Sequence, residues 1–320
     1  MNGDMKQFIW SLFITLCYVC PSCLAQGRVE PIKYGDMDDW VDRQIKESSI
    51  IGGNLKHVYA IAPKQVITGN EPYSNLGGSP WGTSNVLAKV SGIVKTNTSV
   101  FPEKRGNGYC ARLETRIERV KVMGVVNITV LAAGSVHLGS AVEPIRGAKN
   151  PQKYVNMGIP FTRKPVAIQF DYKAKLSGET NRVKISGFGK STIAGKDYPA
   201  MVLYLQKRWE DENGNIYAKR IGTAVTYFEN TEDWKNNATF NIMYGDITGD
   251  SMYNSNRMGL QNEKHGINSK GENVPVKEVA WGNADDVPTH LVLQFTSSHG
   301  GAFIGSPGNT LWVDNVKLIF

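Results

Sequence analysis

Two carboxylates have the chemistry that glycoside hydrolysis requires. Glu114 and Asp171 both fall on the polar side of segments in which apolar and polar residues alternate. Two carboxyl groups on opposite sides of a glycosidic bond can act as acid and as base or nucleophile. If this polar face lines a pocket, the two residues would form a catalytic pair. The alternative is that each is ion-paired across strands with a nearby cation, for which the candidates are Arg112, Arg116 and Lys173.

A second set of side chains suits sugar recognition, which needs flat aromatic faces and polar groups for the hydroxyls. The candidates are Trp81, Asn85, Arg112, Gln169, Lys173, Trp281 and His299. Trp281 is the strongest platform because it lies in a long polar segment, and Trp81 is second. A tryptophan of a β-sandwich is more commonly a core residue, and this alternative stays open. We expect His299, which follows two serines without a nucleophile-elbow motif, to line the mouth of the pocket.

The remaining reactive side chains predict neither a required cofactor nor a zinc site. The other histidines lack metal-ligand spacing; they are His57, His137, His265 and His290. Cys110 is the one cysteine outside the first 25 residues, and its surroundings favour a small buried side chain over a nucleophile. Glycines 300–308 are followed by a strand pattern instead of a helix, which argues against a phosphate-binding loop.

The N-terminal segment predicts export. Residues 8–20 are largely apolar after a lone Lys6, and Cys23-Leu24-Ala25 offers small residues at the positions that signal peptidase prefers. We therefore expect residues 1–25 to be a signal peptide and the mature chain to lie in the periplasm or on the cell surface. A lipoprotein anchored through Cys23 is the alternative. The apolar run is too short to favour a transmembrane segment.

Composition limits the other partners. The chain has 320 residues, of which 41% are hydrophobic, enough for one large β domain or two ordinary ones. Its net charge of +7 is spread among alternating basic and acidic residues instead of forming a stripe. We therefore expect a solvated surface and no nucleic-acid partner.

Strands dominate the elements that must position these residues. Apolar and polar residues alternate with a period of two along residues 120–131, 166–175, 199–209, 216–228, 238–244, 290–296 and 311–320. Turn residues separate these runs, and Asn213-Gly214 predicts a tight hairpin. In the last run we expect Trp312, Val316, Leu318 and Phe320 to close the core. Such a pattern is typical of two antiparallel sheets packed as a sandwich.

Two segments depart from the strand pattern. Residues 39–49 could form one short helix, although their apolar stripe is incomplete. Residues 245–289 are long, polar and mostly aperiodic, and we interpret them as an ordered loop that crosses the domain. Residues 26–320 would then be a single domain with this loop as an insertion.

Several phrases together resemble a known family. They are Trp81-Gly-Thr-Ser-Asn85, the segment 158–165, Phe170-Asp-Tyr-Lys173 and the closing stretch 297–318. Their order and content are similar to the putative carbohydrate-metabolism domain family of Bacteroidetes, exported proteins found with polysaccharide-utilisation systems. The resemblance covers most of the chain from about Tyr34 onward. It implies a jelly-roll β-sandwich with a carbohydrate pocket and, as partners, a glycan and other polysaccharide-utilisation proteins.

A second likeness concerns the two ends of the chain. The segment Tyr34–Trp40 is similar to the opening of jelly-roll carbohydrate-binding modules, in which an early acidic residue and a late aspartate share a structural calcium ion. That resemblance implies a calcium site of Asp36, Asp38 and Asp314, whose hard oxygen ligands would suit the ion. The alternative is that Asp314 caps a turn or bonds backbone amides.

Three functions follow as competing hypotheses. The first is an exported protein that recognises a glycan in a pocket on the concave face of a jelly roll. The second is a glycoside hydrolase that uses Glu114 and Asp171. The third is a structural or adhesive surface domain. Aromatic and amide groups without converging carboxylates would favour binding, whereas two carboxyl groups across an open cleft would favour hydrolysis.

Overall fold

The protein is an all-β sandwich, as its sequence predicts. A computed structural model describes residues 27–320 except 76–77, 123–125, 148–149 and 188, so the predicted signal peptide lies outside the described residues. Strands supply nearly all the regular structure of this part of the chain, and its one α-helix is the four-residue α1 (Ser255–Met258). No helix within it is long and apolar enough to cross a membrane.

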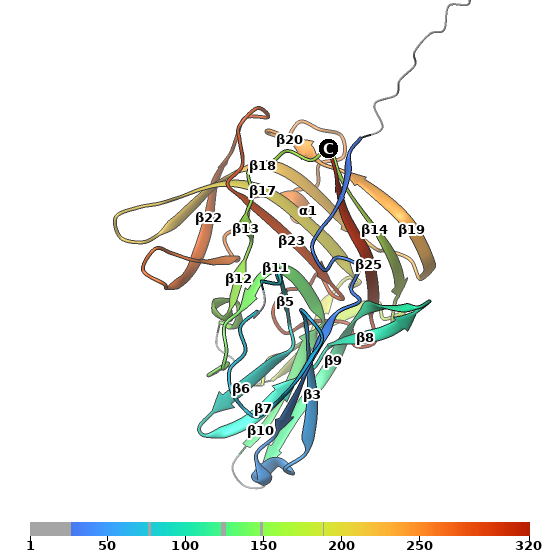
Figure 1. Cartoon of the computed structure of the whole chain (residues 1–320), viewed down its shortest axis with the longest axis vertical. Helices are drawn as coiled ribbons and strands as arrows, with labels where there is room; N and C mark the ends of the chain where they lie inside the picture. The colour runs from blue at the N-terminus through green and yellow to red at the C-terminus, as the bar shows by residue number, and fades with distance from the viewer. Residues whose placement is uncertain (1–26, 76–77, 123–125, 148–149, 188) are drawn as a thin grey trace, which may run out of the picture.

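One layer of the sandwich is a sheet of seven strands, counted over the described residues. Its order is β10 (Val126–Ala133), β9 (Gly108–Val122), β25 (Thr310–Ile319), β14 (Ala167–Lys175) and β19 (Glu232–Asn241). Two further strands join it, β1 (Val29–Pro31) beside β25 and β8 (Val100–Arg105) beside β9. The last strand of the chain therefore lies in the middle of this sheet, between β9 and β14 (Figure 1).

The second layer has ten strands within the described residues. Its order is β12 (Val155–Met157), β11 (Ser135–Ala141), β23 (His290–Thr296), β17 (Ala200–Glu210), β18 (Ile216–Tyr227), β22 (Asn273–Trp281) and β21 (His265–Ile267). Three short strands join it: β5 (Trp81–Thr83) at β11, β13 (Ile159–Pro160) at β23 and β20 (Met243–Tyr244) at β18. The predicted hairpin is confirmed, because the amide of Asp211 donates to the carbonyl of Asn215 (3.0 Å) and Gly214 has a φ of +87°.

Smaller sheets complete the structure. They are β2 (Trp40–Lys46) with β3 (Leu55–Ile61) and β4 (Gln65–Thr68), β6 (Val86–Val90) with β7 (Ile93–Asn97), and β15 (Asn181–Ile185) with β16 (Lys190–Ala194) and β24 (Ile304–Gly305). Short 3-10 turns occupy Ser49–Ile51 and Pro151–Tyr154. Strands β3, β6, β7 and β10 gather at the lower end of the molecule (Figure 1). The hydrophobic core continues from these smaller sheets into the two large sheets, because one cluster contains Met37 and Ile61 together with Leu293 of β23 and Val313 of β25. The single-domain organisation stays a prediction.

The last strand buries a different set of side chains than its sequence pattern predicts. Leu311, Val313, Val316 and Leu318 belong to the core cluster, whereas Trp312 is half-buried outside it. Gln169 of β14 pairs with Lys317 of β25, and Asp171 pairs with Asp314. Between these two pairs the chain advances by two residues in β14 but by three in β25. This β-bulge changes which face the even-numbered residues occupy, so Val316 and Leu318 point inward while Trp312 points outward.

Two other predictions are corrected by the structure. The segment predicted as a short helix is largely the strand β2, whose inward residues are Val41, Arg43 and Ile45. Arg43 is buried because it pairs with Glu143 at 2.8 Å. A charged residue at an inward position interrupts the alternation of apolar and polar residues that would predict a strand. Residues 245–289 are not a loop throughout, because they contain α1, β21 and β22. Strand β22 runs parallel to β18, and Val276 packs against residues of that strand.

Candidate functional site

A polar pocket of about 440 Å³ lies where the β8–β9 hairpin meets β25 and the segment before β2. We call it the acidic pocket. Its lining residues are Asp36, Asp38, Arg105, Gly106, Gly108, Tyr109, Asp314 and Asn315. The three aspartates that the resemblance implied as calcium ligands therefore do come together. Arg105, Tyr109 and Asn315 were not among the predicted site residues.

The floor of the acidic pocket is built around Arg105, the last residue of β8. Its Nη1 donates to Asp171 Oδ2 (2.8 Å) and also to Asp314 Oδ2. Its Nη2 donates to Asn236 Oδ1 (2.6 Å), and the guanidinium lies 3.8 Å from the centre of the Trp234 ring. Only 8% of each aspartate side chain is exposed, against 20% for Arg105. Two carboxylates thus share one cation in a partly buried site.

Their surroundings shift the pKa values of the two carboxyl groups in opposite directions. Burial raises the pKa of Asp314 to about 6, because the Arg105 guanidinium and the Asn315 amide offset that effect only in part. Burial acts in the same direction on Asp171. There, hydrogen bonds from the Asn237 amide, the Asn315 side chain and Arg105 outweigh it and hold the pKa below its ordinary value. Asp314 is therefore the carboxyl group that more readily carries a proton.

Two of the three carboxylates of the acidic pocket that were predicted to bind calcium have other partners, and the calcium site stays a prediction. Asp314 Oδ1 accepts from the amide of Asn315 (2.7 Å), and its other oxygen is bonded to Arg105. Asp38 Oδ1 accepts from the amide of Tyr109 (2.7 Å). In the described ranges no three His, Cys, Asp or Glu side chains are spaced for a metal ion. The alternative interpretation, in which Asp314 bonds a backbone amide, matches this geometry.

Next to the acidic pocket, an aromatic side chain lies between two cations on the outer face of the seven-stranded sheet. Lys173, Trp312 and Arg112 are register partners on β14, β25 and β9. Lys173 Nζ lies 5.4 Å from the centre of the Trp312 ring, and Trp312 Nε1 donates to Glu103 Oε1 (2.8 Å). We call these three residues the tryptophan row. They are half-buried, so part of each side chain can meet a ligand.

Glu114 and Asp171 are not brought together. Glu114 is opposite Thr310, and Asp171 is opposite Asp314 on the other side of β25. Four residues of β25 span about 13 Å, more than the roughly 5–9.5 Å that separates hydrolytic carboxylates. Glu114 instead forms ion pairs with Arg112 and, at 3.8 Å, with Arg116. Glu114 is therefore ion-paired with two of the predicted cations, although both belong to its own strand, whereas Asp171 pairs with Arg105, which was not among the candidates.

Of the predicted sugar-binding residues, Trp81 and Asn85 are interior. Trp81 is 1% exposed, and its Nε1 donates to the carbonyl of Lys33 (2.9 Å). Asn85 is 3% exposed, donates to the carbonyls of Tyr59 and Val100, and accepts from two backbone amides. Neither side chain can contact a ligand without unfolding of its surroundings. Their role is to fix β5 and the loop after it.

The other predicted residues divide between the two sheets. Arg112, Gln169 and Lys173 are on the seven-stranded sheet, where Gln169 Nε2 donates to Thr239 Oγ1 (3.0 Å). Trp281 ends β22 in the ten-stranded sheet, 5.5 Å from the guanidinium of Arg220, which is fully buried and paired with Glu278. His299 follows β23, and its ring stacks on Tyr227 with centroids 4.5 Å apart.

Comparison with known proteins identifies the family. A family model described as "Putative carbohydrate metabolism domain" matches residues 56–319. One similar solved structure is a putative glycoside hydrolase from Bacteroides thetaiotaomicron, 18% identical, with a TM-score of 0.45 over 84% of this chain and 81% of that one. Another is a putative glycoside hydrolase from Bacteroides vulgatus, 16% identical, with a TM-score of 0.39 over 69% and 77%. No curated protein matches the chain.

Proposed function

The chain belongs to the putative carbohydrate metabolism domain family, and we propose that it is an exported protein that binds a glycan through the acidic pocket and the tryptophan row. The observation that carries the proposal is the adjacency of the two features on one face. Glu103 of β8 accepts from Trp312, and Arg105 of the same strand forms the floor of the pocket. A sugar ring could stack on the indole while its neighbour entered the pocket.

The dimensions and chemistry of the acidic pocket suit a sugar unit. Its volume of about 440 Å³ falls within the roughly 300–1,000 Å³ of small-molecule sites. Asp36 is exposed and has no hydrogen-bond partner among the described residues, so its carboxylate is available to accept from hydroxyls. Arg105 and Tyr109 offer donors and an aromatic surface beside it. These groups match the hydroxyls and the C–H face of a carbohydrate.

Binding is better supported than hydrolysis. Both oxygens of Asp171 and both of Asp314 already accept hydrogen bonds from Arg105 or from Asn237 and Asn315. A catalytic carboxyl group needs an oxygen free to meet the glycosidic bond or a water molecule. Hydrolysis remains the second candidate, now with Asp171 and Asp314. A raised pKa at one of two neighbouring carboxyl groups is the pattern of an acid–base pair.

The experiment measures binding to a panel of soluble polysaccharides and oligosaccharides, using residues 26–320. For a glycan that binds, Asp36→Asn should weaken affinity about five- to tenfold, because the side chain loses its negative charge. The matched control is Asp285→Asn, an exposed aspartate after β22 in the other sheet. Equal effects of both changes would argue against the acidic pocket. No binding to any glycan would favour a structural or adhesive role.

The same samples separate binding from hydrolysis. Each glycan that binds is incubated with the protein, and new reducing ends are counted. Binding without release of reducing ends is the result that we expect. Release that Asp314→Asn abolishes would establish the hydrolase instead. Secretion of the full chain, with loss of residues 1–25, tests the proposed export.

A further inference from the structure

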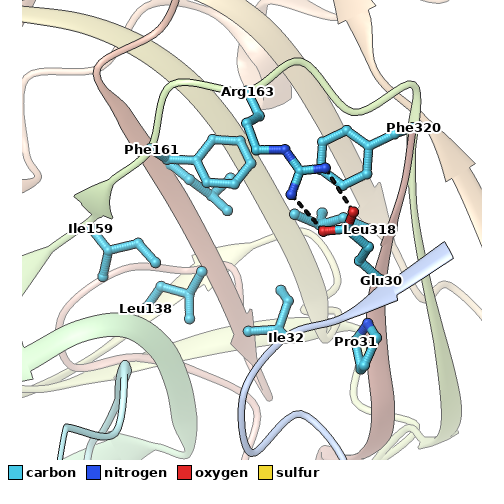
Figure 2. Close-up of a pocket in the computed structure, with 10 residues that line it drawn as sticks. Glu30, Pro31, Ile32, Leu138, Ile159, Phe161, Arg163, Leu318 and Phe320 are labelled. Atoms are coloured by element: carbon cyan, nitrogen blue, oxygen red, sulfur yellow. Dashed lines mark hydrogen bonds and ion pairs between the residues drawn. The ribbon is translucent and has the colours of Figure 1, made fainter. Parts of the chain in front are cut away.

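A second cavity, of about 150 Å³, lies away from the acidic pocket and shares no residue with it. Ten residues line it, mainly from β1, β13, β25 and the segment after β13: Glu30, Pro31, Ile32, Leu138, Ile159, Phe161, Arg163, Leu291, Leu318 and Phe320. Figure 2 shows the apolar side chains around a common space, with Arg163 and Glu30 at one side. We call it the apolar cavity.

The walls of the apolar cavity reach the core of the sandwich. Leu138, Leu291 and Leu318 are at most 4% exposed, whereas Ile159 and Phe161 are partly buried beside them. Apolar cavities of about this volume take up benzene in other proteins. The volume of the space therefore suits one six-membered apolar ring.

At the side of the cavity, an arginine already binds one carboxylate with both of its terminal nitrogens. Arg163 donates from Nη1 and Nη2 to the two oxygens of Glu30, at 2.5 and 2.8 Å. Its guanidinium lies 3.6 Å from the centre of the Phe320 ring, which fixes its plane. Glu30 has a second cation, because Arg28 Nε lies 2.8 Å from its Oε1. Glu30 can therefore stay paired with Arg28 if another carboxylate takes its place on Arg163.

We propose that the apolar cavity binds a small aromatic carboxylate of the size of benzoate. The ring occupies the apolar space, the carboxylate receives the two hydrogen bonds of Arg163, and Glu30 remains with Arg28. A bidentate guanidinium supplies both charge and orientation for such a planar group. This site does not depend on the proposed glycan function, since its residues take no part in the acidic pocket or the tryptophan row.

The test is a titration of residues 26–320 with benzoate, followed by ligand-observed NMR. Toluene and acetate serve as probes that carry only the ring or only the charge. Benzoate should bind more tightly than either. Arg163→Gln should weaken benzoate binding about tenfold, as expected for loss of a charge-assisted contact. Glu30→Gln should strengthen it several-fold, because the competing carboxylate is removed. An ion pair with a purely structural role would give no such opposite effects.

Two further variants test the site independently of Arg163→Gln. Arg28→Gln changes the exposed partner of the same glutamate and should weaken benzoate binding far less than Arg163→Gln does. Ile159→Phe places a ring in the cavity and should abolish binding even if Arg163→Gln does not fold. Thermal melting confirms that each variant is folded. The proposal is wrong if folded wild-type protein does not bind millimolar benzoate, or if Ile159→Phe leaves its affinity unchanged.

Discussion

Asp171 and Asp314, paired across β14 and β25, accept hydrogen bonds from the same nitrogen of Arg105. This relationship helps to explain how two acidic side chains persist in a partly buried site, because one guanidinium pairs with both. It also fixes the plane of Arg105 against Trp234 and so shapes the floor of the acidic pocket. The following predictions depend on it or on the tryptophan row beside it.

Removal of the shared cation should destabilise the protein. Arg105→Gln leaves two largely buried carboxylates facing each other, and we expect the free energy of unfolding to fall by about 2–4 kcal/mol. Urea denaturation measures the change. Arg28→Gln is the matched control, because the Arg28 side chain is 80% exposed and pairs at the surface with Glu30. It should change stability by less than about 1 kcal/mol. Similar values for the two variants would contradict the role of Arg105.

Stability should depend on pH through Asp314. Its pKa in the folded protein is about 6 against an ordinary value of 3.8, so the folded state keeps a proton that the unfolded state loses first. Stability from this group is therefore full at low pH and declines as pH rises from about 4 to 6. Asp171, with a lowered pKa, acts in the opposite direction, but its contribution is lost only below its ordinary value.

The melting temperature of wild type relative to Asp314→Asn should accordingly fall as pH rises through this window. Parallel profiles of wild type and Asp314→Asn would mean that Asp314 titrates normally.

Two tryptophans should behave in opposite ways. Trp81→Ala removes a side chain that is 1% exposed in the core and should cost about 3–5 kcal/mol of stability. Trp312→Ala, on the outer face, should cost about 1–2 kcal/mol and weaken glycan binding roughly tenfold. Chemical denaturation and a binding titration on each variant give the comparison. A Trp312 variant with normal glycan affinity would remove the tryptophan row from the site.

A chelator should leave the melting temperature unchanged. The sequence resemblance implies calcium at Asp36, Asp38 and Asp314, yet the Arg105 guanidinium already neutralises Asp314. Melting with and without EDTA, each followed by added calcium, measures the effect. A fall in melting temperature that calcium reverses would show that these aspartates bind the ion after a rearrangement of Arg105.

Much of the strand layout follows from local pattern, because alternation and turn residues act over a few positions. His290–Thr296 matches its predicted bounds, and the turn at Asn213-Gly214 forms as expected. The pattern failed where tertiary contacts hid it. Arg43 is buried and paired with Glu143, so the sequence of β2 lacks the alternation that predicts a strand. The bulge near Asp314 depends on pairing with β14, which the sequence of one strand does not reveal.

The lining of the acidic pocket could be predicted only in part for the same reason. Asp36, Asp38 and Asp314 do meet, although the resemblance implied a metal among them where Arg105 lies. Asp171 was chosen from strand parity, but its partner across the sheet is Asp314 instead of Glu114. Arg105 had no distinguishing pattern, since one arginine before a turn is common on any surface. Only the register of three strands places it between two aspartates.

The most direct test of the glycan-binding proposal is a crystal structure with a bound oligosaccharide, chosen from the binding panel. We predict density for one sugar unit in the acidic pocket, within hydrogen-bond distance of Asp36, and for its neighbour against Trp312. Density instead on the ten-stranded sheet, at Trp281 or His299, with the acidic pocket free of sugar, would contradict the proposed site.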